Sequence, residues 1–214
     1  MLDEYSTDTH LAILVGKKSG QKYVGAAIKR SIGLQQILEL FEFCDNDQFS
    51  NLDALLVQIG NGTIYLPDDI SSTSKHEYRK LMSVLNRTNF SVNLVKRSSH
   101  FRKSEVMHSM IKLVGDKSHE IVVAETDREF SYPALDCLIQ KLNLLADSES
   151  YNTFDFKLSC LDSFMKLDSS AVEAINLLPK ADEPSQYGSI YGILNKCRLF
   201  NFEKYFYKIH ISSF

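Results

Sequence analysis

The sequence predicts an α/β fold in which an antiparallel meander of strands leads into βαβ units with flanking helices. Three β-like runs come first, at residues 10–18, 22–30 and 32–43, separated only by short polar and glycine breaks. Such spacing is typical of antiparallel hairpins. After about residue 50, helical patterns alternate with short strand-like runs, and this alternation indicates parallel strands with helices packed on the sheet.

The third run, 32–43, has two interpretations. Its position in the meander predicts a strand, whereas Leu34, Ile37, Leu38 and Phe41 have the spacing of one face of a helix. The residues alone leave this choice open.

A helix is expected to begin at about Ser50. The segment from Ser50 to Asp53 matches a capping box, in which the hydroxyl accepts a backbone N–H and the carboxylate reaches back to the first one. Leu52, Leu55, Leu56 and Ile59 then form an apolar stripe, and Gly60 stands at the expected C-terminal stop.

The later elements follow from the same rules. A strand over 63–67 should end at Pro67, and a boundary is expected in the polar segment 146–152. Helices are predicted at 74–87, at 102–114 ending at Gly115, and at 133–146. A second capping box at Ser170 opens a short helix that stops before Pro179. Another strand is predicted at 90–95.

Composition excludes several classes of protein. The net charge of −3 over 214 residues is not the basic footprint of a duplex-DNA binder acting alone. The acidic, polar start and the absence of a long apolar run argue against a secretory signal and a membrane span. Cys44, Cys137, Cys160 and Cys197 form no CxxC pair, which is typical of reduced thiols in the cytosol or nucleus.

An acidic, amide-rich loop precedes the helix at Ser50 and raises the question of a metal site. A calcium loop beginning at Asp45 would need an oxygen ligand at its fifth position and glycine at its sixth, where this chain has Phe49 and Ser50. The alternative is a loop that places negative charge near a helix N-terminus. The candidate residues for this helix-capping or partner-contact role are Asp45, Asn46, Asp47, Gln48, Ser50 and Asp53.

Other catalytic patterns are incomplete. Gly115 to Ser118 lacks the glycine spacing of a phosphate-binding loop, and no HExxH or Gly-x-Ser-x-Gly motif occurs. Three antiparallel strands followed by βαβ units are the outline of ribonuclease-H-like nucleases, which hold two metals with carboxylates. The first strand, 11–18, contains no acid, so a metal-dependent nuclease using Asp45, Asp47 and Asp53 is only the alternative hypothesis.

Two separate segments resemble the MutS family of DNA mismatch repair proteins. LFEFCDNDQFSNLDALLVQIG (40–60), running on to IYLP, is similar to the connector region of the eukaryotic MutS homolog that is common to the mismatch-recognition heterodimers. TFDF (153–156), MKLDSSAVEAINLL (165–178) and LNKCR (194–198) follow in the family's order. The resemblance spans about residues 10–198.

The resemblance implies a domain plan. Residues 10–147 would form a ribonuclease-H-like connector domain without nuclease activity, and 148–198 the start of an all-α lever domain. Residues 1–9 would be an N-terminal extension and 199–214 a divergent tail. It also implies that Leu34 to Phe43 is mainly a strand, and that the loop Asp45 to Gln48 caps and positions the following helix.

The resemblance also implies a role in DNA mismatch repair. The family's subunits pair with a sister MutS homolog, bind duplex DNA as an assembly, signal to MutL homologs and work in the nucleus. Their ATPase uses ATP and magnesium; this chain is expected to lack the ATPase, to hold no cofactor or metal, and to have no catalytic activity or membrane contact. A truncated isoform that competes with the full-length protein is a further alternative.

Overall fold

The computed structural model describes residues 9–32, 35–69, 75–102, 106–115, 128–161, 169–177 and 188–194. They belong to two compact units. The first contains the chain up to Phe49 and from Asn61 to Cys160, and the second contains Ser50–Gly60 and the chain from Leu161 onward. The α/β class and the mixed sheet predicted from the sequence are confirmed.

The first unit is built on a six-stranded sheet with the order β5-β4-β1-β2-β3-β6. The predicted meander is confirmed, since β1 (His10–Lys18) pairs antiparallel with β2 (Gln21–Ile32), which pairs antiparallel with β3 (Gln35–Asp45). The remaining strands, β4 (Asn61–Pro67), β5 (Asn89–Val95) and β6 (Phe154–Ser159), are paired in parallel, to β1, β4 and β3 respectively.

The third run is a strand, which confirms the expectation from the resemblance for the described residues of β3. Its helix-like spacing misleads because β3 is buried on both faces. Leu38 and Leu40 lie in the core under the helices, while Phe41, which points the opposite way, is only 3% exposed. A strand covered on both sides has a near-continuous apolar sequence instead of a strict alternation. Leu34 lies outside the described residues.

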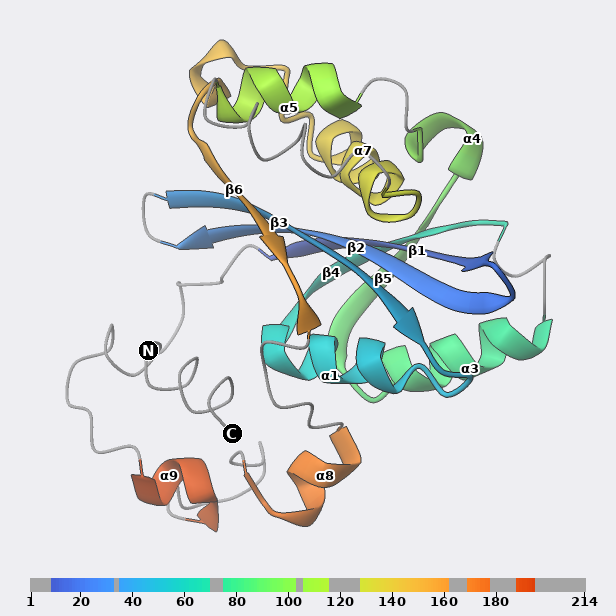
Figure 1. Cartoon of the computed structure of the whole chain (residues 1–214). Helices are drawn as coiled ribbons and strands as arrows, with labels where there is room; N and C mark the ends of the chain where they lie inside the picture. Colours follow the sequence, from blue (N-terminus) through green and yellow to red (C-terminus); the bar gives the residue numbers. More distant parts are fainter. Residues whose placement is uncertain are drawn as a thin grey trace. The chain divides into compact units, whose positions relative to one another are not determined.

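Helices cover both faces of this sheet (Figure 1). α3 (Lys75–Leu85) confirms the predicted helix at 74–87 and lies on the face opposite α7. α4 (Arg97–His100), α5 (Val106–Val114) and α7 (Ser131–Lys141) lie on the other face, and a short 3-10 turn, η1 (Ser148–Ser150), precedes β6.

Two predicted helix boundaries are wrong. Arg102 is not helical; its N–H donates to Asp136 Oδ2 at 3.1 Å, so α5 begins later than expected. α7 ends at Lys141 and not near residue 146, because Asn143 adopts a positive φ of 49° that stops the helix. Leu142 and Leu145 still pack against the core after the helix has ended. Gly115, with φ of 77°, ends α5 as predicted.

The first turn of α7 rests directly on β2 and β3. A Cβ at Gly25 would lie 2.2 Å from the backbone carbon of Phe130, so only glycine permits this approach. Glu42, the cross-strand neighbour of Gly25, accepts hydrogen bonds through Oε2 from the N–H groups of Phe130 and Ser131 at 3.1 and 2.9 Å. A carboxylate at a helix N-terminus is favoured by the helix dipole, so Glu42 fixes where α7 starts.

The strand β6 corrects the expectation of an all-helical segment from residue 148 onward. Phe154, Phe156 and Leu158 alternate and pack against the core shared with α7, while the intervening residues face the other side. The sheet therefore continues past the boundary expected at 147. The limits of the connector and lever domains remain predictions.

The second unit contains α1 (Ser50–Ile59), α8 (Ser169–Ala174) and α9 (Ile190–Leu194). The predicted helix after Ser50 and its stop are confirmed, because Gly60 has a φ of 93° and its N–H donates to Leu56 O at 2.9 Å. α8 confirms a short helix before Pro179, although it begins at Ser169. Residues 1–8 and 195–214, and with them the tail 199–214, lie outside the described residues. The two capping boxes remain predictions.

Candidate interaction site

The acidic loop after β3 is a tight turn held by its own side chains. Asp45 Oδ1 accepts the N–H of Asn46 at 2.8 Å, and Asn46 Oδ1 accepts the N–H of Gln48 at 3.0 Å. The N–H of Phe49 donates to Asn46 O at 3.2 Å, and Phe49 has a φ of 58°. Asn and Asp side chains commonly imitate a backbone turn in this way. The structure thus gathers Asp45 to Gln48 in one turn.

Lys22 on β2 is the centre of the charges around this turn. Its side chain is only 5% exposed, and its Nζ lies 3.2 Å from Asp47 Oδ1 and 3.8 Å from Glu77 Oε1. The same Nζ stands 4.4 Å from the ring centroid of Phe49. A buried ammonium group is costly unless it is paired, and here two carboxylates and an aromatic face compensate it.

Lys17 and Asp47 also belong to the group of charges around Lys22. Lys17 at the end of β1 places its Nζ 3.3 Å from the Glu77 oxygen that also faces Lys22. The pKa of Asp47 is held below its usual value, first by the hydrogen bond from Lys22 and then by the positive charges of Lys22, Lys80 and Lys17. Asp47 is therefore ionised throughout the neutral range.

These residues border a cleft of about 300 Å³ at the carboxyl ends of the parallel strands. Ligand sites of open α/β sheets usually lie at this edge. β1 contributes the residues up to Lys17 to the lining of the cleft, β4 contributes Pro67, and Arg97 follows β5. The residues that line the cleft are Val15, Gly16, Lys17, Lys22, Phe49, Pro67, Asp69, Glu77, Leu81 and Arg97.

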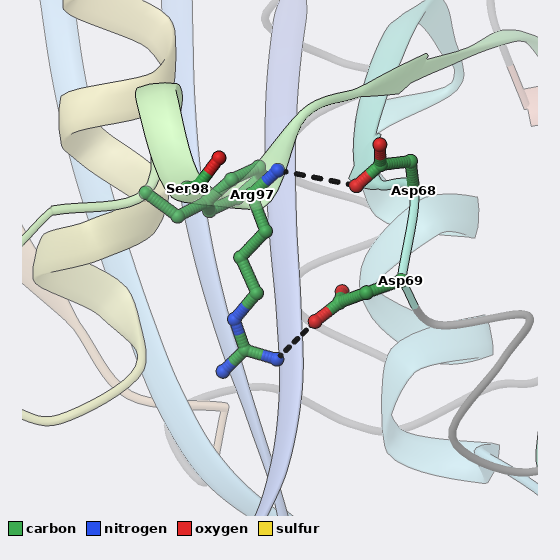
Figure 2. Close-up of a pocket in the computed structure, with 5 residues that line it drawn as sticks. Asp68, Asp69, Arg97 and Ser98 are labelled. Atoms are coloured by element: carbon green, nitrogen blue, oxygen red, sulfur yellow. Dashed lines mark hydrogen bonds and ion pairs between the residues drawn. The ribbon is translucent and has the colours of Figure 1, made fainter.

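A second, shallower hollow of about 470 Å³ adjoins the cleft and shares Asp69 and Arg97 with it. The backbone N–H of Arg97 donates to Asp68 Oδ1 at 3.2 Å, and Nη1 donates to Asp69 Oδ2 at 3.1 Å. Figure 2 shows Arg97 extending from the end of β5 to both aspartates, which follow β4. This ion pair ties the ends of two parallel strands together.

The cleft offers charged and polar binding groups. Its cations face carboxylates of the same cleft, so it can recognise polar or charged groups of both signs. Across the part of the chain that the structure describes, no group of three or more His, Cys, Asp or Glu side chains could hold a metal ion. Asp45 and Asp47 are engaged with Asn46 and Lys22, whereas Ser50 and Asp53 belong to α1 in the second unit. Among the described helices, none is long and apolar enough to span a membrane.

Sequence reasoning missed Lys22, Glu77 and Arg97. Lys22 and Glu77 are far apart in the chain and meet only because α3 crosses back over the sheet. One local signal was present, since Lys22 directly precedes the largely apolar run 23–28 of β2, but the sequence does not show that its ion-pair partners are Asp47 and Glu77.

The fold and the cleft define a mixed α/β sheet domain with a charged groove at the carboxyl ends of its parallel strands. No family model matches the sequence. The chain is 31% identical over 163 residues to the DNA mismatch repair protein msh-2 of Neurospora crassa, covering 75% of this chain and 17% of the relative. It is 31% identical over 151 residues to the DNA mismatch repair protein MSH2 of Saccharomyces cerevisiae, covering 70% and 15%.

A third relative is the DNA mismatch repair protein spellchecker 1 of Drosophila melanogaster, 27% identical over 185 residues, with 84% of this chain and 19% of the relative covered. The chain belongs to the MutS family of DNA mismatch repair proteins, and the resemblance noted in its sequence is confirmed. It spans less than a fifth of the length of these relatives. Among solved structures, NurA with manganese matches at 12% identity with a TM-score of 0.15, which is too low to support an argument.

Proposed function

We propose that the chain acts in DNA mismatch repair as the connector module of a MutS-homolog subunit. In this role the subunit pairs with a sister MutS homolog, binds mismatched duplex DNA through the assembly, and signals to MutL homologs in the nucleus. The observation that carries the proposal is the 31% identity to Neurospora crassa msh-2 over 163 residues. The chain contributes positioning and partner contact, and it has no catalytic activity of its own.

The strand order supports a ribonuclease-H-like connector. A three-stranded antiparallel meander is followed by β4 and β5, which run parallel to β1 on its other side. The first strand carries no carboxylate, although nucleases of this architecture hold their metals from that strand. The cleft holds the charges of Lys17, Lys22 and Glu77. ATP and magnesium belong to the family's ATPase, and the connector acts without them.

The direct test uses the purified chain with a purified sister MutS homolog and a purified MutL homolog. The proposal predicts saturable binding to at least one of them in a surface-immobilised assay, together with no ATP hydrolysis and no DNA cleavage. Binding to neither, combined with magnesium- or manganese-dependent cleavage that Asp45→Asn abolishes, would establish the nuclease alternative. Asp155→Asn is the matched control, because Asp155 is an acid on β6 outside the acidic loop.

A further inference from the structure

The strand β5 forms one edge of the sheet. It pairs with β4, and within the described residues no strand lies on its other side. Alternate backbone N–H and C=O groups of an edge strand point away from the sheet and form a template for another strand. Natural edges are usually protected by charges, proline or a bulge, yet the seven residues NFSVNLV contain neither charge nor proline.

The side chains of β5 are divided between two faces. Phe90, Val92 and Leu94 share one face, opposite Gly62, Ile64 and Leu66 of β4 in the register. Leu94 is 52% exposed, and Phe90 and Val92 are half-buried. The polar Ser91 and Asn93 lie on the other face and are exposed. The edge therefore presents a backbone template beside a row of partly exposed apolar side chains.

The charged residues in the sequence around β5 are mostly basic. From Lys75 to Arg97 the chain has six Lys or Arg residues and one acid, whereas the whole chain has a net charge of −3. Arg87 lies just before β5 and Lys96 just after it, and both are exposed. The Nε of Arg87 donates a hydrogen bond to Ser83 O at 3.2 Å. Positive charge thus flanks an uncharged strand at both ends.

We infer that the outer edge of β5 binds an extended, acidic segment of a partner protein as an added strand. The partner's backbone continues the hydrogen-bond ladder, its alternate apolar side chains cover Val92 and Leu94, and acidic residues at its ends face Arg87 and Lys96. Strand addition of this kind takes affinity from the backbone and specificity from alternate side chains. A nucleic acid fits less well, because β5 carries no cation along its own length to follow a phosphate chain.

The inference identifies a surface and a ligand chemistry that the mismatch-repair role does not specify. The probe is a fluorescent synthetic peptide of alternating valine and serine with an aspartate at each end, titrated into the full chain and followed by anisotropy. Binding should be saturable. Two further peptides carry methyl groups on alternate backbone nitrogens, one on the odd-numbered residues and the other on the even-numbered residues. One of them should lose binding and the other should retain it, because only one set of N–H groups faces the edge.

Two protein variants locate the site. Leu94→Lys and the double change Arg87→Glu with Lys96→Glu should each weaken peptide binding by about tenfold or more, the second by removing charge attraction. Lys112→Glu is the matched control, because it reverses an exposed charge on α5, on the other face of the sheet, and should leave the affinity unchanged. Circular dichroism of each variant checks that it is folded before its affinity is compared.

Several outcomes would overturn the inference: equal binding of both methylated peptides, equal loss in the Lys112→Glu control, or displacement of the peptide by a single-stranded oligonucleotide at comparable concentration. A dimer of the chain that Leu94→Lys dissociates, with no peptide binding, would assign the edge to a second copy instead. Each of these results leaves the mismatch-repair proposal intact, because that proposal is carried by the identity to Neurospora crassa msh-2 and is tested with MutS- and MutL-type partners.

Discussion

Gly25 on β2 lies directly against the backbone at the start of α7. An added Cβ would lie 2.2 Å from Phe130 C and 2.3 Å from Ser131 N, and both are backbone atoms that cannot rotate away. We expect Gly25→Ala to lower the free energy of unfolding by about 1–3 kcal/mol, as overpacked core sites do, measured by urea denaturation. Gly20→Asn is the control, since Gly20 has open space around it and asparagine tolerates its φ of 80°. Unchanged stability in Gly25→Ala would mean that α7 is not seated as described.

The buried thiol of Cys137 on α7 provides a second test of how this helix is packed. Burial raises the pKa of its thiol from 9.0 to about 12. The unfolded chain loses this proton near pH 9 and the folded chain does not, so the associated stability is present below pH 9 and is lost as the pH rises toward 12. We expect the free energy of unfolding to fall above pH 9, and to fall less steeply in Cys137→Ala. Identical slopes would contradict the burial of this thiol.

The strand β6 is held to the sheet by a buried carboxylate. Glu39 on β3 is 5% exposed; it accepts a hydrogen bond from Ser159 Oγ, pairs with Arg30 of β2, and lies 3.9 Å from Lys157 Nζ. Ser159→Ala removes one donor from a buried charge, which costs about 1–3 kcal/mol. Amide exchange should accelerate across Phe154–Ser159 and remain unchanged in β4. Ser91→Ala on the opposite edge strand, where the serine is exposed, should have little effect.

Most elements were predictable because their signals are local. The hairpin breaks, the apolar stripe of α1 and Gly60 each act within a few residues. Two strands required more than local pattern. β3 has helix-like spacing that its burial on both faces explains, and only the family resemblance resolved it. β6 is six residues long and joins the sheet through a parallel pairing with β3 more than a hundred residues earlier, so its short alternation was overlooked.

The candidate site was less predictable than the fold. The acidic loop was recognised, and the structure shows how Asp45 and Asn46 form its turn. Its capping of α1 remains a prediction. The residues that give the cleft its charge pattern come from β2, α3 and the end of β5, and their meeting depends on register and crossover, which the sequence does not show directly.

The strand β6 belongs to the first compact unit, which therefore extends to Cys160. A chain ending at Asp147 loses β6 and leaves Glu39 without Ser159 and Lys157, whereas a chain ending at Cys160 keeps them. We expect the chain ending at Cys160 to unfold at a higher temperature than the chain ending at Asp147. It should also expose less apolar surface to a hydrophobic dye. Equal melting temperatures would show that β6 contributes nothing to the first unit and would favour the boundary expected from the sequence.

The assignment to mismatch repair is tested most directly in a living cell. The matched 163 residues of Neurospora crassa msh-2 would be replaced by the corresponding part of this chain, and the spontaneous mutation rate measured with a repeat-tract reporter. If the chain acts in mismatch repair, we expect a rate close to that of the strain with unaltered msh-2. A chimera that accumulates and still pairs with its sister subunit, yet shows the mutation rate of a deletion strain, would contradict it.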